Sequence, residues 1–150
     1  MNIVFKCGNI FDDNAEAIVN PVNCVGVMGK GLALDFKTRF PDNYELYRTV
    51  CLTHELKIGR CFITKSPNAS NPQYIVNFPT KIHYRHVSKL DYITDGLKDL
   101  VNGLTYYKVK SVAIPAIGCG LGGLRWDLVL EEIIKAFNDT DFLVHIYKPY

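Results

Sequence analysis

Residues 17–23 read Ala-Ile-Val-Asn-Pro-Val-Asn, and residues 112–123 read Val-Ala-Ile-Pro-Ala-Ile-Gly-Cys-Gly-Leu-Gly-Gly. Each segment starts with a short apolar run and passes through a proline into residues that suit a loop. Strands that are apolar on both faces are typical of a sheet covered by helices on both sides. In such sheets, ligands bind beyond the carboxyl ends of the strands. The two segments therefore predict an α/β fold whose ligand loops follow buried strands.

Other runs of the sequence complete this fold. Apolar runs predict further strands at residues 3–5, 60–64, 74–78 and 142–146. Apolar residues at helical spacing predict helices from near Lys30 to before Pro41, from Asp42 through Cys51, over residues 90–104 after a capping box at Ser88 and Asp91, and from near Trp126 to Phe137. Alternating strands and helices predict a three-layer α/β/α sandwich with a central mixed, mostly parallel sheet. With 150 residues and no linker or repeat, a single domain over residues 1–150 is expected.

Composition excludes several classes of protein. With 48% hydrophobic and 21% charged residues, the chain has the profile of a globular protein rather than a disordered one. A net charge of +2 is too small for tight, sequence-independent DNA binding. The five cysteines are odd in number and have no C-x-x-C spacing, so neither a disulfide framework nor a metal site is expected. Without a signal peptide or a run of ~20 apolar residues, we expect no membrane association and a cytoplasmic location.

The first loop whose residues could bind a ligand is residues 20–31. Asn20 and Asn23 lie three residues apart and are followed by three glycines, the last of which opens a helix. Such amides can hold sugar hydroxyls while glycines let the backbone approach a ligand. The alternative is a glycine-rich turn in which the asparagines satisfy backbone groups.

The second loop is residues 114–123, between a buried strand and a helix. Four glycines in six residues leave backbone N–H groups free to bind an anion, and the helix that follows adds positive potential. The loop lacks the G-K-[ST] of a P-loop, and it is not a G-x-G-x-x-G motif with the acidic partner that a dinucleotide-binding fold requires. A diphosphate is therefore the expected ligand.

The third segment is residues 77–81, where Lys81 directly follows a buried strand. Position alone favours an ordinary charged residue at a strand end. A lysine beside a ligand crevice can also serve in acid–base or nucleophilic chemistry.

Together and in this order, the three segments resemble those of the macro domain family. Residues 18–23 and residues 114–121 are similar to its two ligand loops. Residues 28–31, Met-Gly-Lys-Gly, and residues 77–81 are most similar to the DarG-type antitoxin macro domains, which remove ADP-ribose from DNA bases. The resemblance covers essentially the whole chain and implies the α/β/α macro domain fold, without a cofactor.

The resemblance implies a role for each matching residue. The expected ADP-ribose-binding residues are Asn9, Ile10, Val22, Asn23, Gly31, Leu32, Ala33, Gly118, Cys119, Gly120, Leu121 and Gly122. Asn9 and Ile10 would face the adenine, and residues 118–122 would hold the diphosphate. Asn23 would orient the distal ribose, and Lys81 would be the essential catalytic residue.

Two positions depart from the family pattern. Asn9 stands where the family usually has an aspartate that accepts a hydrogen bond from the adenine amino group. A neutral amide accepts more weakly, so lower adenine affinity is expected. Gly122 stands where a protein-directed relative carries a catalytic aspartate, which favours the DNA-directed branch.

The implied activity is hydrolysis of the bond between ADP-ribose and a DNA base, with a thymidine-type linkage favoured. A neutral Lys81 could act as nucleophile or activate water, whereas a charged Lys81 could protonate the departing base. Burial, or cations such as His83 and Arg85, would lower its pKa. The alternatives are a non-catalytic ADP-ribose-binding module, a hydrolase of glutamate-linked protein ADP-ribose or of ADP-ribose-1″-phosphate, and a nucleotide-binding regulatory domain.

The expected partners are ADP-ribose, ADP-ribosylated single-stranded DNA and a DarT-type toxin. Basic residues gather between Lys81 and Lys89, with Tyr84 in their midst. They could contact DNA phosphates while the tyrosine stacks on a base, or they could form an ordinary solvated loop.

Overall fold

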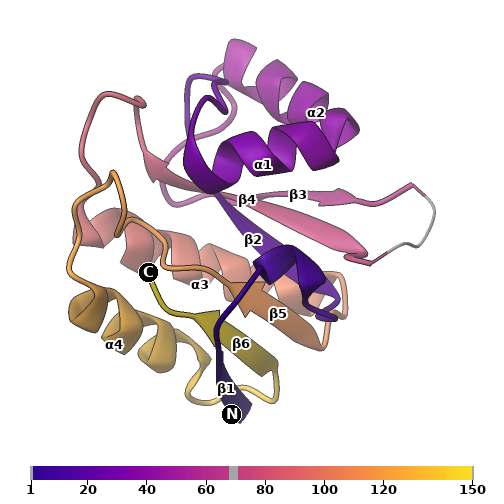
Figure 1. Ribbon diagram of the computed structural model, residues 1–150, viewed down its shortest axis with the longest axis vertical. Coiled ribbons are helices and arrows are strands. Elements are labelled where there is room, and N and C mark those ends of the chain that lie inside the picture. Colours follow the sequence, from indigo (N-terminus) through magenta and orange to yellow (C-terminus); the bar gives the residue numbers. More distant parts are fainter. Residues whose placement is uncertain (1, 68–70, 150) are drawn as a thin grey trace.

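The sheet runs through the centre of the molecule in the order β1-β6-β5-β2-β4-β3. The computed structural model describes residues 2–67 and 71–149. Its elements are β1 (Asn2–Lys6), the 3₁₀ helix η1 (Ile10–Asp12), β2 (Ala17–Asn23), α1 (Gly31–Arg39), α2 (Pro41–Leu52), β3 (Phe62–Lys65), β4 (Tyr74–Lys81), α3 (Leu90–Tyr106), β5 (Ser111–Ile114), α4 (Trp126–Phe137) and β6 (Leu143–Tyr147). All strand pairs are parallel except β3 with β4. The expected mixed, mostly parallel sheet is confirmed (Figure 1).

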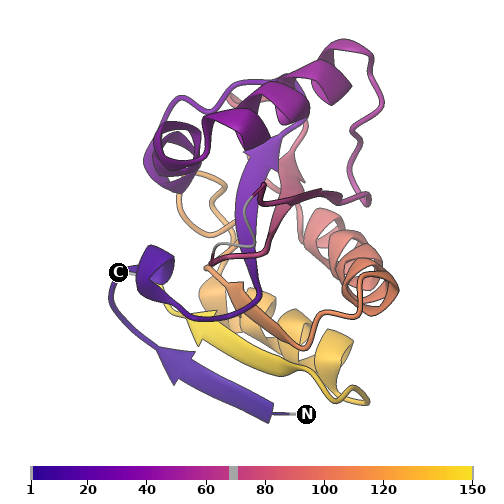
Figure 2. The same ribbon diagram turned by 90° about the vertical axis from the view of Figure 1, so that its right-hand side faces the viewer.

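Helices cover both faces of the sheet, as Figures 1 and 2 show, with α1 and α2 on one face and α3 and α4 on the other. Alternation along β2 explains the two cores, because neighbouring side chains of a strand point to opposite faces. Ala17 and Val19 pack into the core under α3 and α4, whereas Ile18 packs with Phe36 and Tyr47 under α1 and α2. The three-layer arrangement is therefore confirmed. No helix in the described part of the chain has both the length and the apolar character needed to cross a bilayer.

Two helix starts differ from the sequence prediction. Helix α2 begins at Pro41, one residue before Asp42, because a proline at the first helical position loses no hydrogen bond. The capping box predicted at Ser88 is wrong, since Lys89 is the N-cap of α3 and makes no side-chain capping bond. Ser88 instead faces the glycine loop, where its N–H donates to the carbonyl oxygen of Gly122 at 2.9 Å.

Strands β2 and β4 run further than the apolar pattern predicts. They continue past residues 19 and 78 through Pro21 and Pro79. Prolines are tolerated where a strand lacks a neighbour on one side. Strand β5 pairs with β2 only at residues 17 and 18, and β3 pairs with β4 no further than Asn77.

The end of the pairing between β2 and β5 also opens the sheet. Beyond Ile18, strand β2 keeps β4 as a partner but no longer pairs with β5. The loops that follow β2 and β5 therefore separate at their carboxyl ends. A ligand crevice is expected at such a point in a parallel sheet.

Candidate functional site

A groove of about 1600 Å³ lies at the carboxyl ends of the parallel strands. Its volume exceeds that of ordinary small-molecule pockets, which run to ~1,000 Å³, and suits an extended ligand. It is lined by twelve of the thirteen predicted site residues: Ile10, Val22, Asn23, Gly31, Leu32, Ala33, Lys81, Gly118, Cys119, Gly120, Leu121 and Gly122. The fold thus brings together segments that lie far apart in the sequence.

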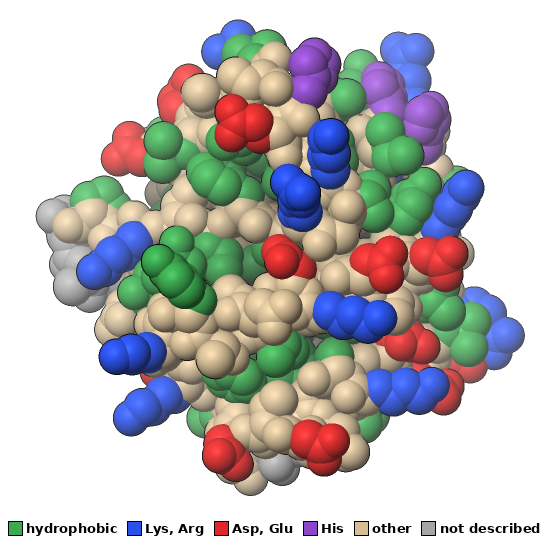
Figure 3. Space-filling view, turned by 180° about the vertical axis from the view of Figure 1, so that it is seen from behind, with side chains coloured by type: hydrophobic (Ala, Val, Ile, Leu, Met, Phe, Trp, Pro, Cys, Tyr) green, Lys and Arg blue, Asp and Glu red, His purple; other side chains and the backbone are tan. Residues whose placement is uncertain are grey.

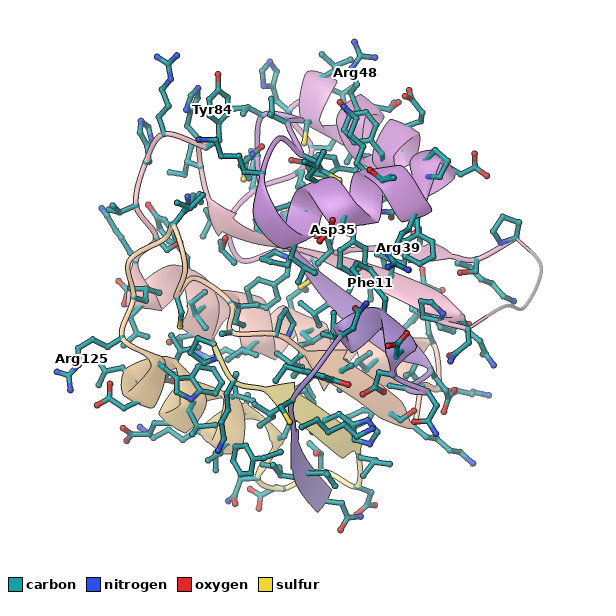
Figure 4. All side chains as sticks on the ribbon, viewed as in Figure 1. Phe11, Asp35, Arg39, Arg48, Tyr84 and Arg125 are labelled. Atoms are coloured by element: carbon teal, nitrogen blue, oxygen red, sulfur yellow. The ribbon has the colours of Figure 1, made fainter. Side chains whose placement is uncertain are left out.

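Asn9, the thirteenth predicted residue, does not line the groove. Its side-chain Oδ1 accepts a hydrogen bond from the Phe11 N–H at 2.9 Å and so caps η1. The guanidinium of Arg39 in α1 lies 4.4 Å from the centre of the Phe11 ring, and Phe36 packs edge-on to that ring (Figure 4). These contacts hold η1 against α1 and place Ile10 in the groove wall.

The glycine loop presents unused backbone donors to the groove. Among the residues that the structure describes, no acceptor pairs with the N–H groups of Gly118, Gly120, Leu121 or Gly122. Gly118 has a φ of +76°, a left-handed conformation that glycine adopts without strain. Successive free N–H groups in such a turn form an anion-binding nest. The loop therefore has the geometry expected of a diphosphate site.

Gly122 is packed too closely to carry a side chain. A Cβ atom at this position would lie 2.5 Å from the carbonyl oxygen of Gly118 and 2.5 Å from Oγ of Ser88. The neighbouring Gly120 has no heavy atom within 4 Å of the corresponding point. The carboxylate that a protein-directed relative carries at this position has no room here.

The side chain of Asn23 organises the loop after β2. Its Oδ1 accepts hydrogen bonds from the N–H groups of Val25 (3.1 Å) and Val27 (3.4 Å) and from the Tyr47 hydroxyl (2.8 Å). Its Nδ2 donates to the carbonyl of Val27 at 2.7 Å. Since Oδ1 is fully used, only the second N–H of the amide is left for a ligand.

Asn20, the other amide of this loop in the sequence, has a different position. It lies on β2 with none of its surface exposed, and its Nδ2 donates to Oδ1 of Asn77 at 3.2 Å. Asn77 in turn exchanges hydrogen bonds with Asn43 of α2. The prediction that both amides hold sugar hydroxyls is therefore wrong for Asn20, which belongs to a buried polar network between the sheet and α2.

Lys81 is the last residue of β4 and the register partner of Asn23 in β2. The backbone contact continues one residue further, where the N–H of Cys24 donates to the carbonyl of Ile82 at 3.1 Å. Desolvation by partial burial lowers the pKa of Lys81 below its ordinary value. No carboxylate of the described residues lies within ion-pair distance of the amine. The side chain is therefore an unpaired amine inside the groove. Of the two residues expected to lower its pKa, Arg85 lines the groove and His83 does not.

The groove carries charge of one sign. Its charged lining residues are Lys30, Lys81, Arg85 and Lys148, and no Asp or Glu from the described part of the chain lines it. Because the chain as a whole has 15 acidic residues, the lack of Asp and Glu among the described lining residues is a feature of the groove and not of the composition. Such a surface attracts a polyanion. Sequence reasoning missed Lys30 and Lys148, although the position of Lys148 just after the last parallel strand was an available signal.

A buried cluster behind one end of the groove was also missed. The Asp13 carboxylate accepts hydrogen bonds from the Tyr147 hydroxyl (2.6 Å) and the Ala15 N–H (2.7 Å), and Nδ1 of His145 lies 2.9 Å away. The Lys6 ammonium lies 3.4 Å from the same carboxylate. These contacts join β1 to β6, whose final residue, Tyr147, lines the groove. The partners are too distant in sequence for any local pattern to indicate them.

No group of three or more His, Cys, Asp or Glu in the described ranges is arranged to hold a metal ion.

Comparison with known proteins gives consistent results. The sequence model of the Macro domain family matches residues 19–133. A DNA ADP-ribosyl glycohydrolase of Thermus aquaticus is 45% identical over 146 residues, which cover 97% of this chain and 41% of that protein. Curated relatives of this kind are thus longer, and the chain spans about two-fifths of their length.

Solved structures agree closely in fold. The macrodomain of Mycobacterium tuberculosis DarG matches with a TM-score of 0.96 at 42% identity, over 99% of this chain and 98% of that one. Thermosipho africanus DarTG in complex with ADP-ribose matches with a TM-score of 0.91 at 33% identity, over 99% of this chain and 42% of that one.

Proposed function

This chain belongs to the macro domain family, and on that premise we propose that it removes ADP-ribose from a modified DNA base, with a thymidine-type linkage favoured. The proposal depends most on one observation. The half-buried amine of Lys81 lies in a groove that has cationic side chains and free N–H groups but no carboxylate among its described lining residues. This arrangement suits a sugar diphosphate, and the partly buried amine of Lys81 is the group that we assign to the reaction.

The lining suggests how ADP-ribose would lie. The free N–H groups of residues 118–122 would bind the diphosphate. Residues 31–33, at the N-terminus of α1, and the remaining N–H of Asn23 would hold the distal ribose beside Lys81. The adenine would then lie toward Ile10 and Tyr147. Asn9 would contribute by holding η1 in place, since its own side chain does not line the groove.

We assign Lys81 to act as the neutral amine. Desolvation favours the neutral form, and no described carboxylate stabilises the charged one. A neutral amine can attack the anomeric carbon of the distal ribose as the bond to the base breaks, or it can take a proton from an attacking water. Either step requires the ribose to be held in position, which the bonds around Asn23 support.

The groove favours a base over an acidic side chain as the leaving group. Three exposed apolar side chains, Val27, Val87 and Leu121, line the mouth of the groove, and exposed apolar surface beside a cleft commonly marks a binding site. They suit a planar base. A glutamate-linked substrate is less favoured because Gly122 leaves no room for the carboxylate used by a protein-directed relative.

A DarT-type toxin as partner belongs to the same proposal. The Thermosipho africanus DarTG structure contains ADP-ribose, and a curated relative from that species is a fusion of a DNA ADP-ribosyl transferase with a DNA ADP-ribosyl glycohydrolase. A cytoplasmic location is also proposed. All five cysteines are free, which suits a reducing compartment.

The test is release of ADP-ribose from single-stranded DNA modified by a DarT-type toxin. We expect Lys81→Ala to lower the rate ~10²–10⁴-fold while calorimetry still detects binding of free ADP-ribose. Lys98→Ala, on an exposed position of α3, is the matched control and should behave as wild type. Binding without release by the wild type would identify an ADP-ribose reader instead. Release only from a glutamate-linked peptide or from ADP-ribose-1″-phosphate would identify one of the other hydrolases.

A further inference from the structure

Residues 82–87, within the connection between β4 and α3, carry an exposed array of rings. Tyr84 is 45% exposed, and the His83 ring lies 4.2 Å from it at an interplanar angle of 30°. The His86 ring lies 5.2 Å from His83 on a 41° tilt. Ile82 and Val87, at the ends of the segment, are 49% and 64% exposed. We call His83, Tyr84 and His86 the ring array; Tyr84 lies at the outer edge of the molecule in Figure 4.

Basic residues accompany the ring array in the sequence. The guanidinium of Arg85 lies 5.8 Å from the centre of the Tyr84 ring. Residues 81–90 contain Lys81, Arg85 and Lys89 and no acidic residue. Seen from behind, histidine, basic and hydrophobic side chains gather at the upper corner of the molecule where this segment lies (Figure 3). Rings interleaved with cations are what a single nucleic-acid strand requires, since bases stack on the rings and phosphates bind the cations.

Hydrogen bonds fix the segment to both groove loops. At one end, the carbonyl of Ile82 accepts from the N–H of Cys24 at 3.1 Å. At the other end, the N–H of Ser88 donates to the carbonyl of Gly122 at 2.9 Å. Between them, the N–H of His86 donates to the carbonyl of His83 at 3.0 Å, and the N–H of Arg85 donates to Nδ1 of His83 at 3.1 Å. The ring array is therefore held at a defined place beside Lys81.

We propose that the ring array binds the nucleotides that flank the modified base, and that it binds them as an unpaired strand. This inference rests on the proposed function. In a duplex the faces of the bases are stacked on one another, so exposed rings can engage them only when the strand is single or the bases are displaced. Tyr84 and Arg85 also line the groove, so a strand on the ring array would lead its modified nucleotide to Lys81.

The experiment compares two substrates that share the same linkage. One is an ADP-ribosylated single nucleoside, and the other is a single-stranded oligonucleotide with the modified nucleotide at its centre. The wild type should have the higher kcat/KM on the oligonucleotide. In Tyr84→Ala the ratio of kcat/KM, oligonucleotide over nucleoside, should fall about tenfold, equal to ~1.4 kcal/mol and within the range for one stacked base. Tyr84→Phe should keep most of the ratio because the ring remains.

Matched controls lie on α3. Tyr106 is 78% exposed at the far end of the helix, and Lys98 is an exposed cation, so alanine variants of both should leave the ratio unchanged. Annealing a complementary strand to the oligonucleotide should slow release by the wild type.

Several results would overturn the inference while leaving the proposed function intact. These are equal wild-type efficiency on both substrates, an unchanged ratio in Tyr84→Ala, and undiminished release from the annealed duplex. If the wild type released ADP-ribose from neither substrate, the proposed function itself would fail.

Discussion

Asn23 and Lys81 are register partners on the adjacent strands β2 and β4, directly after an irregularity in the pairing at Val22. The amide assigned to the ribose and the amine assigned to the reaction are thus held by sheet hydrogen bonds rather than by loops. Residues on a rigid sheet keep their separation, which positioning a sugar for attack requires. Asn23, the last residue of β2, lines the groove, whereas Asn20, three residues earlier on the same strand, is buried.

The first prediction concerns the protonation state of Lys81. If the neutral amine is the reactive form, kcat/KM must rise with pH until the amine has lost its proton. Because desolvation lowers the pKa of Lys81, the rise should level off below the ordinary lysine value of 10.5. The measurement is a pH–rate profile of ADP-ribose release under kcat/KM conditions.

A profile that falls at alkaline pH would assign Lys81 the role of a proton donor and refute the neutral-amine assignment. If the profile rises as expected, a reductive trap separates the two possible uses of the neutral amine. Attack on the anomeric carbon would leave a sugar adduct on the peptide that contains Lys81, as measured by mass spectrometry. Activation of water would leave none.

The second prediction concerns Tyr47, which is buried and donates from its hydroxyl to both the carbonyl and Oδ1 of Asn23, each at 2.8 Å. Tyr47→Phe removes these bonds while keeping the ring. We expect kcat/KM to fall about 5–20-fold, in line with the ~1–2 kcal/mol of a buried hydrogen bond. Tyr44→Phe on the same helix is the control, because the Tyr44 hydroxyl bonds to the carbonyl of Gly26 at 3.3 Å and leaves Asn23 untouched. Equal effects of both substitutions would show that the loop, and not Asn23, is what Tyr47 supports.

Much of the fold was predictable because the strands and the amphipathic helices leave a local pattern. Short apolar runs, several of them β-branched, located all six described strands, and the glycines of residues 118–123 correctly indicated a loop with free N–H groups. The ends of β2 and β4 were not predictable. A proline usually excludes a central strand, and the sequence does not reveal that β2 loses its β5 neighbour after Ile18.

The roles of individual side chains were less predictable than the locations of the strands and loops. Asn20 and Asn23 look alike in sequence, yet one bonds to Asn77 in the core and the other lines the groove. That difference depends on how far along β2 each residue lies, because Asn23 is at the carboxyl end of the strand and Asn20 is not. Ser88 has the sequence of a helix cap, but its N–H bonds to Gly122, which is 34 residues away. Contacts between distant segments decide such cases, and a single sequence does not display them.

The third prediction tests the close packing of the glycine loop. Gly122→Ala would place a methyl group 2.5 Å from the Gly118 carbonyl oxygen, so the loop must shift and its N–H groups must lose their alignment. We expect affinity for ADP-ribose to fall at least about tenfold, since overpacking costs ~1–3 kcal/mol. Gly120→Ala is the matched control, because its Cβ would meet no heavy atom within 4 Å. Calorimetry on both variants decides the matter, and equal affinities would mean that the loop does not need its present shape to bind.

The fourth prediction concerns stability and rests on Asp13. Burial alone would raise the pKa of this carboxyl group, but hydrogen bonds from Tyr147, His145 and the Ala15 N–H outweigh burial and hold the pKa below its ordinary value of 3.8. A carboxyl group whose pKa is lowered on folding stabilises the protein above its unfolded-state pKa. That stabilisation is lost as the pH falls through 3.8 toward the folded-state value.

Asp13→Asn should therefore lower the free energy of unfolding at pH 7, by roughly 1–3 kcal/mol for a buried charged hydrogen-bond acceptor. The difference in unfolding free energy between variant and wild type should narrow as the pH falls below about 4, because the carboxyl group of the unfolded wild type then takes up a proton before that of the folded protein does. Urea denaturation at pH 7 and pH 3 measures the gap. Asp12→Asn, at the exposed neighbouring position, controls for the loss of a surface charge. A gap that stayed constant with pH would mean that the cluster stabilises the β1–β6 junction through packing and neutral hydrogen bonds rather than through the charge of Asp13.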